Sequence, residues 1–97
     1  MREIVISPAA QRDIDDIWTS SIAEWGSART IKYVTALRDT VARLAEMPEI
    51  APACDHVKAG HRKYGVGSHI IFFTATPDQI DIVRILHQRM DVGRHLT

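Results

Sequence analysis

Apolar residues in the first half of the chain recur at the three- and four-residue spacing of helices with one apolar side. Residues 2–6 precede this pattern and are rich in β-branched residues, so they predict a short strand. Ser7 and Pro8 predict the start of a helix, because a serine hydroxyl caps the first turn and proline fits its first position. The first apolar stripe is expected to pack into the core, with both tryptophans as anchors and Trp25, near the helix end, open to partial exposure: Ile14, Ile17, Trp18, Ile22 and Trp25. The acidic residues fall mostly off this stripe and are expected to face solvent: Asp13, Asp15, Asp16 and Glu24.

A second helix is predicted after Gly26, a residue suited to end the first one. Ser27 is expected to cap this helix, and Pro48 to stop it. Its apolar stripe consists of Ile31, Val34, Leu37, Val41 and Leu44. Because the break between the two amphipathic helices is so short, they are expected to fold back on each other as a hairpin.

After a connecting loop over residues 48–60, the spacing of apolar residues changes from helical to extended. Three strands are predicted, over residues 61–66, 68–75 and 79–87. The links between them are short, which favours antiparallel neighbours. Residues 1–97 are therefore expected to form one α+β domain, with an N-terminal strand, an antiparallel helical hairpin and a three-stranded, mainly antiparallel sheet.

Composition agrees with a globular protein, since 45% of the residues are hydrophobic and 25% are charged. No apolar run is long enough to span a bilayer, and the single Cys54 cannot form an internal disulfide, so a cytoplasmic location is expected. The net charge of zero hides an asymmetry, because all five histidines and an excess of basic residues lie after residue 55. A basic surface there would suit phosphates or an acidic protein segment, and chance explains the asymmetry equally well.

Common catalytic and metal-binding motifs are absent from the sequence, so we expect no cofactor and no metal. The basic residues of the second half are the remaining candidates for chemistry. By strict alternation Arg84 shares a face with Ile82 and Leu86, so it is either paired with a carboxylate at the edge of the core or part of a site. A metal-free ribonuclease could use Arg62, Arg84 and His87. It would also need a group to activate the 2′-hydroxyl, and no tyrosine stands in the C-terminal segment.

Several short segments, weak one by one, together resemble the ParE toxins of the RelE/ParE superfamily, the toxic halves of bacterial type II toxin–antitoxin pairs. They span nearly the whole chain: 7–10, 13–18, 25–26, Arg62, 67–73, 82–87, 90–91 and 95–96. The resemblance implies the fold predicted above. It also implies a cognate antitoxin, whose C-terminal segment wraps the toxin while its N-terminal part dimerises and binds operator DNA.

The resemblance further implies DNA gyrase as the target, whereas ribosome-dependent cleavage of mRNA belongs to the RelE branch. The chain lacks the lysine-rich cleft and the C-terminal catalytic tyrosine of that branch, which favours a non-enzymatic inhibitor over an mRNA interferase. Candidate target-binding residues are Arg62, Arg84, His87, Arg89, Met90, Asp91 and Arg94. Replacing Arg84 or Arg89 is expected to reduce toxicity more than stability, because both sit where the last strand reaches the surface.

Overall fold

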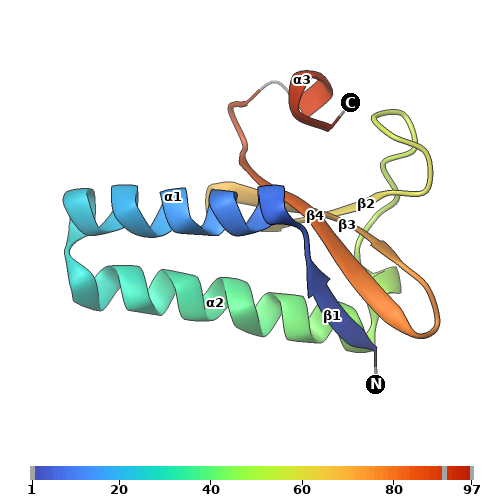
Figure 1. The fold of residues 1–97 in the computed structure, drawn as a ribbon, viewed down its shortest axis with the longest axis horizontal. Helices are drawn as coiled ribbons and strands as arrows, with labels where there is room; N and C mark the ends of the chain where they lie inside the picture. Colours follow the sequence, from blue (N-terminus) through green and yellow to red (C-terminus); the bar gives the residue numbers. More distant parts are fainter. Residues whose placement is uncertain (1, 91, 97) are drawn as a thin grey trace.

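The computed structural model describes residues 2–90 and 92–96 and confirms the α+β class. A helical hairpin lies beside a sheet, with a third, short helix beyond the last strand (Figure 1). The elements are β1 (Glu3–Ile6), α1 (Pro8–Trp25), α2 (Ser27–Glu46), the 3-10 turn η1 (Pro48–Ile50), β2 (Arg62–Val66), β3 (His69–Ala75), β4 (Gln79–His87) and α3 (Val92–Leu96). In the described part of the chain, no helix has the length and apolar character needed to cross a membrane.

The sheet contains four strands in the order β1-β4-β3-β2. Strand β3 is antiparallel to both β2 and β4, as expected, and β1 adds a fourth strand parallel to β4. A parallel pair needs a long crossover between its strands, and the helical hairpin lies within that connection. The short N-terminal strand therefore joins the sheet at the edge of β4 and places α1 against it.

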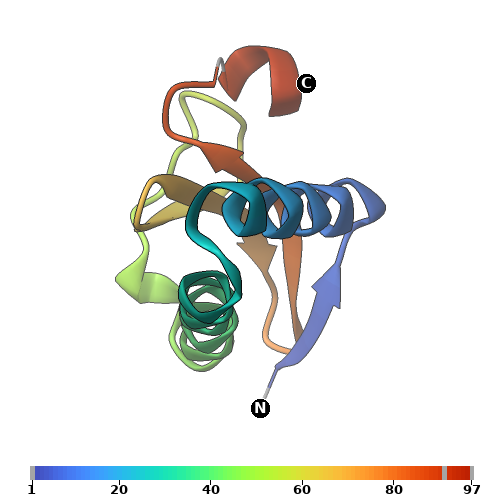
Figure 2. The same ribbon diagram turned by 90° about the vertical axis from the view of Figure 1, so that its left-hand side faces the viewer.

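Apolar clusters cover both faces of the sheet. Helices α1 and α2 pack on one face, and Figure 2 shows α2 end-on below α1 with the strands behind them. Their core combines helical and strand residues: Ala10, Ile17, Leu37, Val41, Leu44, Ala45, Ala51, Ile71, Phe73, Ile80, Ile82 and Ile85. The opposite face is covered by α3 and the connecting loop, through Cys54, Phe72, Leu86 and Leu96.

An irregularity in β4 corrects the predicted faces of this strand. The register between β3 and β4 shifts between Phe72 and Phe73, so Phe72 pairs with Arg84 and Phe73 with Ile82. As a result Ile82 packs with the helices and Leu86 in the opposite cluster. The expectation that Ile82 and Leu86 lie on one face was therefore wrong, because a β-bulge between Ile82 and Arg84 breaks strict alternation.

The predicted N-terminal cap of α1 at Ser7 is confirmed, and the predicted cap of α2 at Ser27 is wrong. The Ser7 hydroxyl accepts the Ala10 N–H at 3.0 Å and donates to the Val83 carbonyl at 2.8 Å, so this cap also ties α1 to β4. Ser27 does not cap α2, contrary to expectation. It is the first helical residue, and the capping position belongs to Gly26 at φ 83°, a left-handed conformation that glycine adopts without strain.

Candidate functional site

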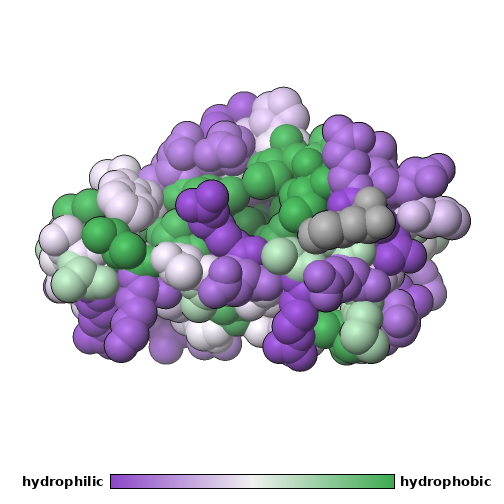
Figure 3. Space-filling view, turned by 90° about the horizontal axis from the view of Figure 1, so that it is seen from below, coloured by the Kyte–Doolittle hydropathy of each residue, from purple (hydrophilic) through white to green (hydrophobic). Residues whose placement is uncertain are grey.

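The helix pair leaves an apolar groove open to solvent. Its floor is a small hollow of about 50 Å³ lined by Ile6, Ile14, Val34, Leu37, Arg38, Val41 and Ile85. Along α1, Trp18 and Ile22 follow Ile14 at intervals of four residues and therefore lie on the same side of the helix. Along α2, Ile31 lies one turn before Val34. We call this surface the helix groove and define it by Ile6, Ile14, Trp18, Ile22, Ile31 and Val34. Figure 3 shows hydrophobic side chains gathered in a hollow on this side, bordered by polar ones.

Several residues of the helix groove were predicted to lie in the core and are exposed instead. Trp18 is 39% exposed, Ile22 38% and Ile31 53%, so these three apolar side chains lie at the surface, whereas Trp25 is half-buried, as its place near the helix end allows. The α1 residues that are buried are Ala10, Ile17 and Ser21. Two of these are small and let the helix approach the sheet closely. The apolar stripe of α1 is thus wider than the surface that the sheet covers, and its outer part has no partner within the described chain.

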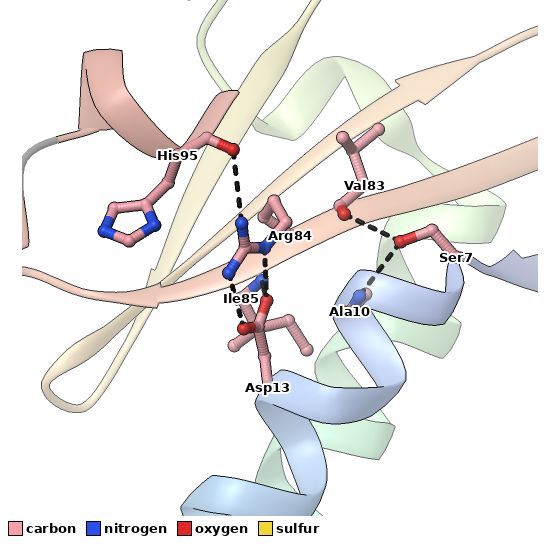
Figure 4. A network of polar contacts seen from close by, with 7 residues as sticks. All are labelled: Ser7, Ala10, Asp13, Val83, Arg84, Ile85 and His95. Carbon is pink, nitrogen blue, oxygen red and sulfur yellow. Dashed lines mark hydrogen bonds and ion pairs between the residues drawn. The ribbon is translucent and has the colours of Figure 1, made fainter. Parts of the chain in front are cut away.

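Arg84 joins three elements at the end of β4 (Figure 4). Its guanidinium forms a bidentate ion pair with Asp13 of α1, with Nε–Oδ2 and Nη2–Oδ1 distances of 2.8 Å. Its Nη1 donates to the His95 carbonyl of α3 at 3.2 Å. The hydrogen bond with Asp13 raises the pKa of Arg84 above its ordinary value. Of the two roles that the sequence left open, the structure thus shows the pairing with a carboxylate.

Asp13 was expected to face solvent, and the structure contradicts this. Its side chain is 11% exposed, and Oδ2 also accepts the backbone N–H of Ile85 at 2.9 Å. Strand β1 pairs with β4 only as far as Ile82, so the edge of β4 beyond that residue lacks a strand neighbour. The Asp13 carboxylate supplies an acceptor in its place. Sequence spacing could not reveal this contact, because its partners lie 71 and 72 residues away.

Three rings form a connected cluster beside the end of β4. The His69 and His87 rings meet edge to face with their centres 5.3 Å apart, and the Tyr33 hydroxyl lies 2.7 Å from His69 Nδ1. Since that hydroxyl donates its one proton to the Val66 carbonyl, at 2.9 Å, His69 Nδ1 carries the hydrogen of the second bond. His87 Nδ1 accepts the Arg89 N–H at 3.1 Å. Both histidines line an open cavity of about 270 Å³ with Asp13, Asp16, Ile17, Ser20, Ile85 and Met90.

Acidification is expected to destabilise the protein in part through His69. Burial, and then the neighbouring His87, lower the pKa of His69 below its ordinary value. His69 therefore binds a proton more readily in the unfolded chain than in the folded one. Neutral His69 contributes its full stabilisation of the folded state above the unfolded pKa of about 6.5, and this contribution is lost as the pH falls from there through the lower folded pKa. Urea unfolding at pH 5 and pH 7.5 should show a smaller pH dependence in His69→Gln than in the wild type. His56→Gln, at an exposed histidine, serves as the control, and an equal change in both variants would contradict this assignment.

The Tyr33 ring packs directly against Gly67, and we expect Gly67→Ala to be destabilising by about 2 kcal/mol or more. A Cβ at this position would lie 2.6 Å from Tyr33 Cε1, and the backbone has φ 57°. Gly60→Ala is the matched control, since Gly60 has φ 78° and a Cβ there would have no heavy atom within 4 Å. That variant should therefore show the backbone strain alone, about 1 kcal/mol. Equal losses in urea unfolding would mean that the contact with Tyr33 does not matter.

The remaining candidate residues lie apart from one another. Arg89 and Met90 are exposed in the segment after β4, and Arg94 is exposed on α3, whereas Asp91 lies outside the described residues. Arg62 sits on β2, where its Nη1 donates to the Ala51 carbonyl at 2.7 Å.

The three residues of the ribonuclease alternative do not converge. Arg62 pairs with Phe73 of β3, and His87 pairs with His69 of the same strand. Those rows are four positions apart along β3, about 13 Å. The cavity beside His87 is also bordered by two carboxylates, which disfavours a phosphate there. This arrangement does not place two arginines and a histidine around one phosphate.

Comparison with known proteins adds a consistent set of relatives. The model of a family described as "ParE toxin of type II toxin-antitoxin system, parDE" matches residues 4–92. Toxin ParE1 of Mycobacterium tuberculosis is 42% identical over 93 residues, 95% of each chain. Toxin ParE1 of Caulobacter vibrioides is 34% identical over 96 residues, 99% of each chain. A solved structure titled "Chromosomal ParDE TA system from P. aeruginosa" shares the fold, with a TM-score of 0.77 over 90% of this chain and 96% of that chain at 19% identity.

Proposed function

Since the chain belongs to the ParE toxin family of type II toxin–antitoxin systems, we propose that it arrests growth by inhibiting DNA gyrase without enzymatic activity, and that a ParD-like antitoxin neutralises it. The observation that carries the antitoxin part is the helix groove. Three large apolar side chains there are at least 38% exposed over a hollow whose lining is apolar except for Arg38. Such a groove suits the apolar face of an amphipathic helix, which would bury these residues on binding.

The position of the basic residues supports binding over catalysis. Arg62 donates to a backbone carbonyl and Arg84 is paired with Asp13, so neither guanidinium is arranged around a common substrate position. The rival function, ribosome-dependent mRNA cleavage, would require a catalytic centre in which these arginines surround one phosphate, and their contacts disfavour that arrangement. We propose that the toxin acts in the cytoplasm and contacts its target through the segment at the end of β4 and through α3. The residues concerned are Arg84, His87, Arg89, Met90, Asp91 and Arg94, and Arg62 on β2 is a further candidate outside that surface.

Induced expression with and without the cognate antitoxin tests the proposal. We expect growth arrest with the toxin alone and normal growth when the antitoxin is present. Mapping of mRNA ends from arrested cells separates the two modes of action, because gyrase inhibition leaves ribosome-bound messages uncut. Growth unaffected by the toxin would contradict the proposal, and cleavage at defined codon positions would favour the mRNA interferase.

A further inference from the structure

The end of the helical hairpin carries a second pocket, separate from the helix groove. It has a volume of about 370 Å³ and lies between the last residue of α1, the first half of α2 and the turn that joins β2 to β3. We call it the hairpin pocket, and its lining consists of Trp25, Arg29, Lys32, Tyr33, Ala36 and Ser68.

The aromatic walls of this pocket are held in place without a ligand. The Trp25 and Tyr33 rings meet edge to face at 5.9 Å, and the Arg29 guanidinium lies 4.6 Å from the centre of the Trp25 ring. Tyr33 is fixed further by its hydrogen bonds to Val66 and His69. Because these side chains are already ordered, binding would immobilise little more of the protein.

The charge of the hairpin pocket is positive. Both charged residues in its lining are cations, Arg29 and Lys32. Within residues 2–90 and 92–96, neither has a carboxylate at ion-pair distance. Arg84, by contrast, is paired with Asp13 and makes three side-chain hydrogen bonds. A ligand that brings a negative charge and a small apolar group would therefore complement this pocket.

A carboxylate of a peptide fits these features better than a nucleic acid does. Base stacking needs a free aromatic face, whereas Trp25 is covered by Arg29, and Tyr33 packs so near Gly67 that a methyl group there would lie 2.6 Å away. A nucleic acid would also be expected to meet a longer stripe of basic residues than two. The net charge of zero agrees with this choice.

We propose that the hairpin pocket binds an acidic residue of the same antitoxin segment that occupies the helix groove, an inference that rests on the proposed function. The groove ends on α2 at Ile31, and the next residue, Lys32, lines the hairpin pocket. Neighbouring residues of a helix are about 100° apart, so the path around α2 is roughly 10 Å, or about three extended residues. One chain can therefore occupy both sites.

Charge reversal tests this assignment. The binding of the purified cognate antitoxin would be measured for the wild type, for the double variant Arg29→Glu/Lys32→Glu, and for the control Arg12→Glu/Arg43→Glu. The control makes the same change of charge at exposed positions outside both sites. We expect the hairpin variant to bind at least about tenfold more weakly at low salt, with a smaller loss at 0.5 M salt, and the control to stay within about twofold.

A charge swap then locates the partner. Replacing one acidic residue of the antitoxin segment by lysine should restore affinity for the hairpin variant and not for the control variant. Equal affinities of the wild type and the hairpin variant would overturn the inference and leave the proposed function intact. Failure of the wild type to bind the antitoxin would overturn both. Binding of a fluorescent oligonucleotide that is lost in the hairpin variant would overturn it in favour of nucleic acid.

Discussion

Asp13→Ala is expected to lower the free energy of unfolding by about 3 kcal/mol. The substitution removes both oxygens that bind Arg84 and the acceptor of the Ile85 N–H, so it leaves the Nε and Nη2 donors of the guanidinium and a backbone donor without partners at a half-buried strand edge. The side chains of the pair are only 20% and 11% exposed, so water replaces these bonds poorly. Equilibrium urea unfolding at pH 7.5 measures the effect.

Asp16→Ala is the matched control, because Asp16 lies one turn further along α1 and is exposed. It should change the free energy of unfolding by less than about 0.5 kcal/mol. Arg84→Ala is expected to cost about 2 kcal/mol, and the double variant less than the sum of the two. Equal stabilities of Asp13→Ala and Asp16→Ala would show that the ion pair contributes nothing measurable.

Trp18→Ala is expected to weaken antitoxin binding by about 100-fold, the second large effect. Trp18 is the largest exposed side chain of the helix groove, at 39%, and a partner helix would enclose it. Because it lies outside the buried core, its loss should change the free energy of unfolding by less than about 1 kcal/mol. Calorimetric titration with the cognate antitoxin gives the affinity, and urea unfolding of the free toxin gives the stability.

Met47→Ala is the control for this prediction, since Met47 is 51% exposed and lies outside the groove. Its affinity should match that of the wild type. If Trp18→Ala unfolds the protein instead, Ile22→Ala tests the same surface with a smaller side chain. Undiminished affinity in a folded Trp18 or Ile22 variant would mean that the antitoxin binds elsewhere.

Local rules predicted the elements of the fold well. The cap at Ser7, the break at Gly26 and the change of spacing after residue 60 depend on neighbouring residues, and the structure has the corresponding helices and strands. The pairing of β1 could not be read in this way, because parallel strands are joined by a distant crossover. The bulge in β4 depends on how β3 meets it, which no alternation pattern records.

The candidate sites were predicted less completely, for the same reason. The sequence separated Arg84 from ordinary strand residues but could not choose between its two roles, since Asp13 approaches it only in the folded chain. An apolar stripe identifies the side of α1 that avoids water, and only the packed sheet decides that Trp18 is left outside. The exposed Trp18 is the main indication of a binding surface, and only the folded structure shows its exposure.

A gyrase supercoiling assay with the purified toxin is the decisive test of the proposed target. We expect inhibition that rises with toxin concentration, and recovery of supercoiling when the cognate antitoxin is added first. We also expect Trp18→Ala to inhibit gyrase still while the antitoxin protects poorly against it, because the hollow of the helix groove and the cavity at the end of β4 have only Ile85 of their linings in common. Supercoiling that continues unchanged at a large excess of folded toxin would rule out gyrase as the target.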